Sequence, residues 1–140
     1  MKIALAETEA DIARCYPIMV ELRPHLGAEE FVSRVRRQQA ADFHLAYLEQ
    51  AGAVCAVAGF RYLDSLAWGK VLYVDDLVTA EAMRSRGHGG RLFDWLVAQA
   101  KRHRCDEFHL DSGVQRFRAH RFYLRRRMDI NCHHFALKLK

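Results

Sequence analysis

The most informative part of the sequence is Val71–Ala100, VLYVDDLVTAEAMRSRGHGGRLFDWLVAQA. Its first part, Val71–Thr79, is rich in β-branched and aromatic residues, which is typical of a strand. Its last part carries apolar residues at helical spacing, at Leu92, Leu96 and Ala100. A glycine-rich segment lies between the two. The stretch therefore predicts a strand, a loop, and an amphipathic helix whose first turn is rich in glycine.

The glycine-rich segment has the composition of an anion site. Gly87, Gly89 and Gly90 are poor helix formers, each costing about 1 kcal/mol relative to alanine. A helix N-terminus offers unpaired N–H groups and the positive end of a dipole, and glycine lets an anion approach them closely. Arg84 and Arg86 add fork-shaped donors for phosphate oxygens. The pattern predicts a pyrophosphate cradle, and a glycine-rich turn that only caps a helix is the alternative.

Two common phosphate-binding motifs do not fit this segment. It has no Gly-Lys-Ser/Thr, as a P-loop has, and no Gly-x-Gly-x-x-Gly, as a dinucleotide-binding fold has. The spacing Arg84-x-x-Gly87-x-Gly89 instead resembles the Arg/Gln-x-x-Gly-x-Gly/Ala motif of the GNAT superfamily of N-acetyltransferases. Thr79 lies eight residues before Gly87, where that family ends its central strand. The resemblance extends downstream through Tyr123, and the N-terminal part matches in layout.

The resemblance implies an α/β fold, classed as α+β by some schemes. We expect a mixed, mostly antiparallel sheet of six to seven strands, splayed at its centre and flanked by about four helices. Residues 1–140 are expected to form a single GNAT acetyltransferase domain. The residue patterns agree with this order of elements. They predict strands at 2–6, 43–49, 54–62, 71–79 and 107–111, and a final strand or strand pair at 130–139. They predict four helices: one that begins near Thr8, one at 29–39, one that enters through the glycine-rich segment and ends at about 103, and one at 115–126.

Composition limits the function further. The chain has 51% hydrophobic residues, no stretch near the roughly 20 apolar residues of a membrane span, and no sign of a secretory signal at its start. Its four cysteines form no Cys-x-x-Cys pair, so we expect reduced thiols and a cytoplasmic location. The net charge of +5 without a long basic run favours a polyphosphate cofactor over nucleic acid. The eight histidines show no ligand spacing, so no metal site is expected.

The resemblance implies acetyl-CoA as the cosubstrate, lying between the splayed strands. Backbone groups of Leu77, Val78 and Thr79 would pair with its pantetheine arm, as an added strand does, and the Leu77 N–H would polarise the thioester carbonyl. The pyrophosphate would lie on the amides of residues 86–90. The residues expected to bind the cofactor are Leu77, Val78, Thr79, Arg84, Ser85, Arg86, Gly87, His88, Gly89, Gly90, Ser112 and Arg116. For Ser112 a plain turn role is the alternative, and for Arg116 a solvated side chain.

Two adjacent carboxylates are the candidates for proton transfer. An amine must be neutral to attack a thioester, so a base or a water chain to a carboxylate is useful. Strand alternation places Tyr73, Asp75, Leu77 and Thr79 on one face. In the family the carboxylate often lies four residues before the strand end, so Asp75 is the preferred proton acceptor and Asp76 a contact for the substrate ammonium or a structural group. The alternative is that either carboxylate only pairs with a nearby arginine.

The segment Ala119-His-Arg-Phe-Tyr123 resembles the Ala-x-x-x-Tyr helix of the family, whose tyrosine is the general acid. Tyr123 is therefore expected to protonate the leaving thiolate, and an aromatic residue packed under the sheet is the alternative. Two departures from the family pattern stand out. Arg116 replaces an asparagine near the pantetheine, and Arg127 replaces the glycine that would ease the exit from this helix, which puts the local turn in doubt.

These features together predict an N-acetyltransferase that moves acetyl from acetyl-CoA to a primary amine by direct attack in a ternary complex. A non-catalytic regulatory module that binds acetyl-CoA or CoA is the alternative. A nucleic-acid-binding protein using the helix at 116–127 is a third, and it would show steep salt dependence. Small amines, polyamines, lysine side chains, protein N-termini and amino-sugar drugs all stay open as acceptors. Because many members of the family pair through their last strands, a homodimer is a reasonable expectation.

Overall fold

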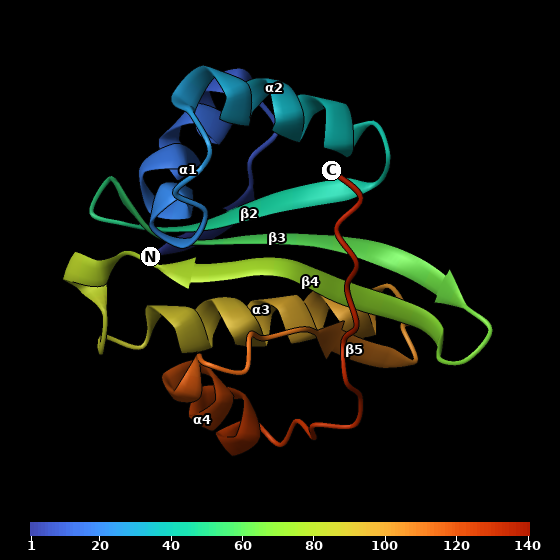
Figure 1. The fold of residues 1–140 in the computed structure, drawn as a ribbon. Helices are drawn as coiled ribbons and strands as arrows, with labels where there is room; N and C mark the ends of the chain where they lie inside the picture. The colour runs from blue at the N-terminus through green and yellow to red at the C-terminus, as the bar shows by residue number, and fades with distance from the viewer. The chain divides into compact units, whose positions relative to one another are not determined.

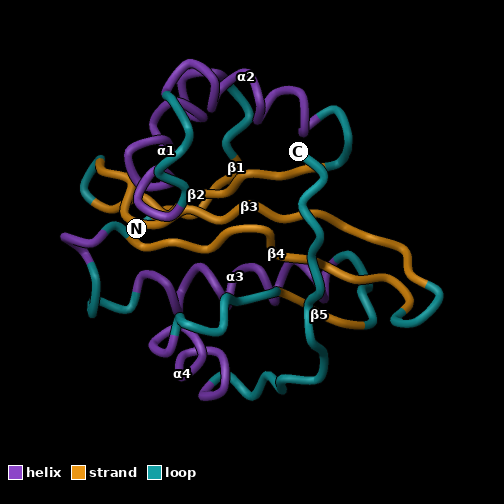
Figure 2. Tube along the Cα trace, viewed as in Figure 1, coloured by secondary structure: helices purple, strands orange, loops and turns teal.

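The structure is a computed structural model that describes residues 1–140 in two compact units, residues 1–109 and residues 110–140. Its strands and helices follow one another along the chain as Figures 1 and 2 show. They are β1 (Lys2–Leu5), α1 (Glu9–Leu22), α2 (Ala28–Gln39), β2 (Phe43–Gln50), β3 (Ala53–Ser65), β4 (Gly69–Thr79), a short 3-10 helix (Glu81–Met83), α3 (His88–Arg102), β5 (Glu107–Leu110) and α4 (Phe117–Arg125).

The strands form one mixed sheet in the order β1-β2-β3-β4-β5. The first three pairs are antiparallel, and β4 and β5 run in the same direction (Figure 1). The α/β class and the mostly antiparallel mixed sheet are thus confirmed, with five strands where six to seven were expected. The helix between β4 and β5 is what allows two neighbouring strands to run in parallel.

The missing strand is the one predicted at 130–139, and that prediction is wrong. Residues 128–140 form no helix or strand, although their apolar side chains alternate with polar ones. Ile130, Phe135, Leu137 and Leu139 are exposed. An alternating pattern supplies the side chains of a strand, but only a neighbouring strand can pair its N–H and C=O groups.

Helices cover both faces of the sheet in the first unit. Figure 1 shows α1 and α2 on one face and α3 on the other. Ile12 of α1, Phe31 of α2 and Val78 of β4 belong to one continuous buried cluster. On the opposite face Phe60 of β3 is buried and meets Trp95 of α3 edge to face, with ring centroids 6.2 Å apart. Buried side chains thus pack against β3 and β4 on both faces of the sheet.

The predicted helix signals at the N-terminus are confirmed. The Thr8 hydroxyl caps α1 by accepting a hydrogen bond from the Asp11 N–H at 3.1 Å. The helix ends at Leu22, and Arg23 is its C-cap residue. No helix of the protein is both long enough and apolar enough to cross a membrane.

Each of two helices is followed by an arginine whose backbone has the left-handed conformation that glycine usually adopts there. After α4 the Arg127 φ is 66°, and the Met128 N–H donates to the Tyr123 carbonyl at 3.1 Å. After α3 the Arg104 φ is 57°, and the Cys105 N–H donates to a carbonyl one turn back at 2.9 Å. Both ends have the hydrogen-bond pattern of a Schellman motif. The turn after α4 therefore forms even though arginine replaces glycine there.

Candidate active site

The centre of the site is a β-bulge in β4. Gly59 of β3 lies opposite Asp76, and Phe60 lies opposite Val74, so Asp75 is an extra residue on the β4 side of the pair. A bulge leaves its extra residue unpaired and locally breaks the alternation of side chains along the strand. It lies at the adjacent carboxylates that the sequence singled out.

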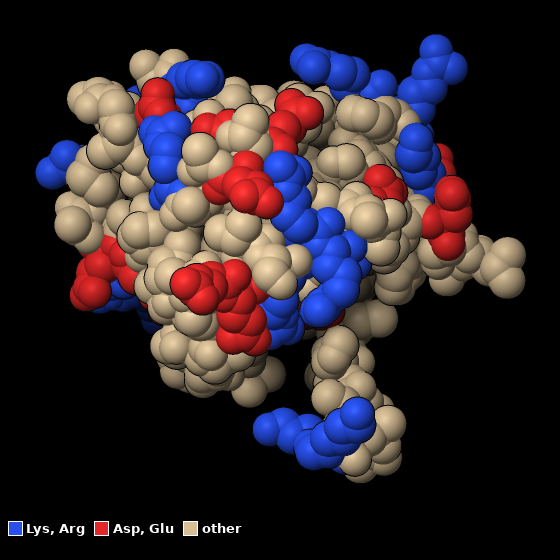
Figure 3. All heavy atoms as spheres, turned by 90° about the horizontal axis from the view of Figure 1, so that it is seen from above, with Lys and Arg blue, Asp and Glu red and all other residues tan.

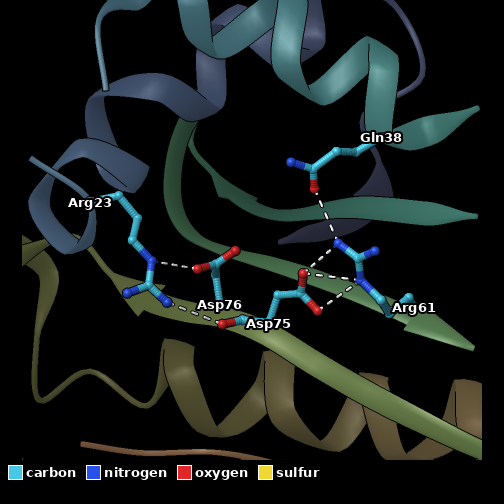
Figure 4. Close-up of polar contacts among 5 residues, drawn as sticks. All are labelled: Arg23, Gln38, Arg61, Asp75 and Asp76. Carbon is cyan, nitrogen blue, oxygen red and sulfur yellow. Dashed lines mark hydrogen bonds and ion pairs between the residues drawn. The ribbon is translucent and has the colours of Figure 1, made fainter. Parts of the chain in front are cut away.

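The bulge corrects the expected facing of the strand. Alternation alone put Tyr73, Asp75, Leu77 and Thr79 on one face. In the structure Asp75 and Asp76 both point to the side of α1 and α2 (Figure 4), whereas Thr79 approaches the first turn of α3. The extra residue reverses the alternation from Asp76 onward, so Leu77 shares the α3 face with Thr79. Both carboxylates are thereby brought to one side of the sheet.

Asp75 is fully engaged by an arginine of β3. The Arg61 guanidinium binds both carboxylate oxygens, with its Nε at 3.1 Å from each and an Nη2–Oδ2 distance of 2.6 Å. The same guanidinium donates to the Gln38 side-chain oxygen at 3.1 Å and lies over the Phe43 ring. The hydrogen bond to Asp75 raises the pKa of Arg61. This forked pair matches the alternative reading of Asp75, a carboxylate that pairs with a nearby arginine.

Asp76 is held on one side only. Arg23 Nε donates to its Oδ1 at 2.7 Å, and Arg23 Nη2 donates to the Asp75 carbonyl at 3.2 Å (Figure 4). The second oxygen, Oδ2, has no hydrogen bond. Burial raises the pKa of Asp76 above its usual value, and the neighbouring Arg23 offsets that rise only in part. Asp76 is thus a half-buried carboxylate with one oxygen open and an increased affinity for a proton.

A hollow of about 160 Å³ adjoins Asp76 between the first two helices and the sheet. Its polar lining residues are Arg23, His25, Arg34, Gln38 and Asp76, and its apolar ones are Met19, Leu26, Phe31, Val35, Phe43 and Leu45. The hollow is therefore large enough for a small group and has one carboxylate at its sheet side. Arg23 and Arg61 belong to this candidate site through their ion pairs, and no sequence pattern pointed to them, because Arg23 lies 53 residues before Asp76 and Arg61 lies 14 residues before Asp75.

The end of β4 presents free backbone groups away from β3. The Ala80 N–H donates to the Cys55 carbonyl at 2.8 Å, which makes that pair a hydrogen-bonded one. Bonded and non-bonded pairs alternate in an antiparallel ladder, so Val78 is bonded to β3, whereas Leu77 and Thr79 are not. The N–H and C=O groups of Leu77 and Thr79 therefore point away from β3, and those of Val78 are committed to it.

The neighbouring strand does not reach these free groups. β5 follows Asp106, whose N–H donates to the Lys70 carbonyl at 2.7 Å and whose carboxylate accepts from the Lys70 N–H at 2.8 Å. From this level β5 has only four residues, Glu107–Leu110, and runs in the same direction as β4. It ends before Leu77, which leaves the expected gap in the sheet beside the last residues of β4.

The start of α3 has the unpaired N–H groups that an anion needs. Gly87 is its N-cap residue with φ of 81° and no side-chain cap, and the Arg91 N–H makes the first intrahelical bond, to the Gly87 carbonyl at 3.1 Å. The N–H groups of His88, Gly89 and Gly90 are therefore without intrahelical partners. A Cβ on Gly87 would have no atom within 4 Å, whereas one on Gly89 would lie 3.0 Å from the Thr79 hydroxyl oxygen. The helix start is open to an anion and packs tightly on β4.

The side chains around this helix start are basic. Arg84, Ser85 and Arg86 are exposed, and the Ser85 φ is 67°. His88 is buried, with 3% of its surface exposed, and neither of its ring nitrogens has a hydrogen-bond partner. A buried polar group without a partner costs about 1–3 kcal/mol, so this histidine calls for an explanation.

The second unit holds the remaining predicted residues. Tyr123 lies on α4 and is half-buried, and burial raises the pKa of its hydroxyl, with Arg116 acting in the opposite direction. Arg116 is the N-cap residue of α4. Ser112 has a buried hydroxyl without a hydrogen bond. The His120 ring donates from Nε2 to the Gly113 carbonyl at 2.8 Å, which ties α4 to the loop before it.

Other site types find less support. No group of three or more His, Cys, Asp or Glu side chains is arranged to hold a metal ion. The four cysteines are free. Basic and acidic side chains are interspersed on the face that α1 and α2 form (Figure 3), so this face is not the single-sign basic surface that binds a nucleic-acid backbone.

Comparisons with known proteins identify the family and the fold. The family model of the acetyltransferase (GNAT) family matches residues 6–128. The chain is 37% identical over 112 residues, 79% of each protein, to the uncharacterized N-acetyltransferase YhdJ of Bacillus subtilis (strain 168). Among solved structures it resembles the ribosomal-protein-alanine N-acetyltransferase of Brucella melitensis biovar Abortus 2308, with a TM-score of 0.84, 14% identity, and coverage of 99% of this chain and 100% of that one.

A second solved structure is similar to the same degree. It is AAC(6')-Iy in complex with the bisubstrate analogue CoA-S-monomethyl-acetylneamine, with a TM-score of 0.83, 12% identity, and coverage of 99% of this chain and 97% of that one. At such identities the two structures bear on the fold alone, whereas the family model and the sequence relative extend over most of the chain. The protein therefore belongs to the GNAT family of acetyltransferases.

Proposed function

We propose that the protein is an acetyl-CoA-dependent N-acetyltransferase that acetylates a primary amine by direct attack in a ternary complex. One observation carries the proposal: the outward backbone groups of Leu77 and Thr79 lie beside a helix start with three unpaired N–H groups. We further propose that residues 1–140 act as one domain, since the family model extends across both units.

The residues present fit acetyl-CoA. The N–H groups of residues 88–90 would hold the diphosphate, with Arg84 and Arg86 beside it. Leu77 and Thr79 would pair with the pantetheine arm as a neighbouring strand would, and the Leu77 N–H would polarise the thioester carbonyl. Acetyl-CoA supplies an activated acetyl group when it is bound.

Asp76 is proposed as the proton acceptor for the attacking amine, directly or through one water. It has an open oxygen, it borders a hollow, and burial raises its pKa toward the range in which a base both accepts and releases protons. Asp75 is proposed as a positioning residue, because Arg61 occupies both of its oxygens. The ion pairs thus favour the reverse of the roles that the sequence suggested for the two carboxylates.

Tyr123 is proposed as the general acid that donates its hydroxyl proton to the sulfur of the leaving thiolate. The support is the match of its helix to the family pattern, and its hydroxyl, whose pKa burial raises, carries the proton that a general acid donates. Ser112 and Arg116 stay proposals for cofactor contacts. A cytoplasmic location is proposed from the free thiols, and a homodimer from the exposed apolar residues near the C-terminus.

A non-catalytic module that binds acetyl-CoA or CoA is the second candidate. The observation in its favour is that both carboxylates of the site are paired with arginines. Such a protein would bind the cofactor and leave it intact with every amine offered.

The test of the proposal is a panel of primary amines with acetyl-CoA, in which the release of free thiol is followed. Turnover of at least one amine, with loss of turnover in Asp76→Asn and retention in Asp64→Asn, supports the enzyme. Asp64 is a suitable matched control because it is another aspartate of the β3–β4 hairpin. Tight CoA binding without turnover of any amine would support the binding module instead.

A further inference from the structure

A second hollow, of about 310 Å³, lies between the β2–β3 turn and the start of α3. Gln50 and Ala51 line it from the turn, and Met83, Arg86, His88 and Arg91 line it from the segment that leads into α3 and from its first turn. It shares Arg86 and His88 with the proposed diphosphate cradle. The other lining residues have no place in the site described so far.

The charge of this hollow is uncompensated. Two arginines line it, and no carboxylate does. Arg86 makes no hydrogen bond or ion pair, and the side chain of Arg91 makes one hydrogen bond, from its Nη1 to the Met1 sulfur at 3.5 Å. Guanidinium groups in this number usually find acidic partners within the protein or a bound anion. The hollow therefore favours a compact anionic ligand and disfavours a metal ion or an amine.

His88 is a second and independent sign of a ligand. It lines the hollow, it is almost completely buried, and both of its ring nitrogens lack a partner. Nearly all buried polar side chains are hydrogen-bonded to protein, water or ligand. An anion with several acceptor oxygens would supply partners to the histidine after a small turn of its ring, and to both arginines.

We propose that this hollow is a second anion site, and that it binds the phosphate monoester on the ribose of CoA. The proposal rests on the proposed function, because it takes the diphosphate of the same molecule to lie on the adjacent amides. A phosphate monoester carries a charge of about −1.5 to −2 near neutral pH and three acceptor oxygens, which suits two forked guanidinium groups. The site would make the protein select CoA over dephospho-CoA, which lacks only that phosphate.

The test compares the affinities of CoA and dephospho-CoA by titration calorimetry for the wild type, Arg91→Gln and Arg37→Gln. Arg37 is a matched control, because it is an exposed helical arginine on α2 without a hydrogen bond or ion pair. We expect the wild type to bind CoA at least roughly tenfold more tightly than dephospho-CoA, the effect of one lost charge-assisted contact. Arg91→Gln should remove most of this preference and leave the affinity for dephospho-CoA unchanged, whereas Arg37→Gln should keep the preference.

A second measurement distinguishes the source of the phosphate. Millimolar inorganic phosphate should weaken the binding of CoA more than that of dephospho-CoA, since both cofactors compete with it for the diphosphate cradle but only CoA also competes for the hollow. Equal affinity of the wild type for the two cofactors, or an equal loss of both in Arg91→Gln, would overturn the proposal. Phosphate binding at the hollow without any preference for CoA would overturn the assignment to the cofactor. Failure of both cofactors to bind at all would instead refute the proposed function.

Discussion

Exchanging each carboxylate of the bulge for its amide separates the two roles proposed for them. Asp76→Asn keeps the size of the side chain and its contact with Arg23 but removes the proton acceptor. Asp75→Asn removes the charge that Arg61 grips with three contacts of 2.6–3.1 Å. The first variant should therefore lose activity, and the second should lose stability.

The magnitudes follow from burial and pairing. Loss of a positioned general base lowers kcat by about 10²- to 10⁴-fold, and we expect that for Asp76→Asn. Its stability should change by less than about 1 kcal/mol, because relief of the burial penalty on the Asp76 charge offsets the weaker bond to Arg23, a side chain that is 40% exposed. Asp75→Asn should cost about 1–2 kcal/mol of stability, discounted because its partner Arg61 is 28% exposed, and less than about tenfold in kcat.

Thiol release at saturating acetyl-CoA measures the activity of these variants, and thermal unfolding followed by circular dichroism measures their stability. Asp64→Asn removes a charge from the same hairpin and should leave both quantities near those of the wild type. The reasoning is refuted if Asp75→Asn abolishes turnover while Asp76→Asn retains it, because the open oxygen of Asp76 would then have no catalytic role.

Four further results are expected. Gly89→Ala should raise the unfolding temperature of the ligand-free protein by less than the roughly 1 kcal/mol of helix propensity alone would give, because its Cβ would lie 3.0 Å from the Thr79 hydroxyl oxygen, and Thr79→Ala in the same chain should recover the shortfall; additive effects would contradict the contact. Arg104→Gly should raise the free energy of unfolding by about 1 kcal/mol, because it relieves the strain of a left-handed arginine, which outweighs the greater backbone entropy of glycine in the unfolded chain. Tm should then rise by about 4 °C, and a fall in Tm would show that the arginine is not strained. Tyr123→Phe should lower kcat by roughly 10²-fold and leave CoA affinity unchanged; unchanged kcat would exclude it as the acid. Folding raises the pKa of Asp76, so the wild type should lose stability relative to Asp76→Asn as the pH rises from the usual carboxyl pKa of about 3.9 through the raised pKa. A difference in unfolding free energy between the two proteins that stays constant across that pH range would argue against the raised pKa.

Local patterns in the sequence were enough to predict most elements. The period of the apolar residues placed α3, and the hydroxyl of Thr8 marked the start of α1. The family was recognisable from the spacing of Gly87 and Gly89 after β4, since a helix start open to an anion requires small residues at fixed positions. Such features depend on neighbours a few residues away, which is why the sequence alone contains them.

The structure corrected the predictions that depended on partners far along the chain. Alternation failed at Asp75, because a bulge against β3 inserts one residue and reverses the facing of the later residues of β4. The prediction of a strand at 130–139 is wrong because no neighbouring strand pairs with these residues. Two ion pairs decide which carboxylate keeps an open oxygen. Arg23 pairs with Asp76 across 53 positions of the chain, and Arg61 pairs with Asp75 across 14 positions.

The family, the order of most elements and the place of the proposed anion cradle could therefore be predicted from the sequence, because each depends on residues within one strand, turn or helix. The packing of separate elements established which carboxylate has an open oxygen and which backbone groups of β4 point away from β3. It also brought Arg86, His88 and Arg91 together with Gln50 around one hollow. Strand register and charge pairing arise when separate elements pack together, and the packing of one element does not follow from its own residues.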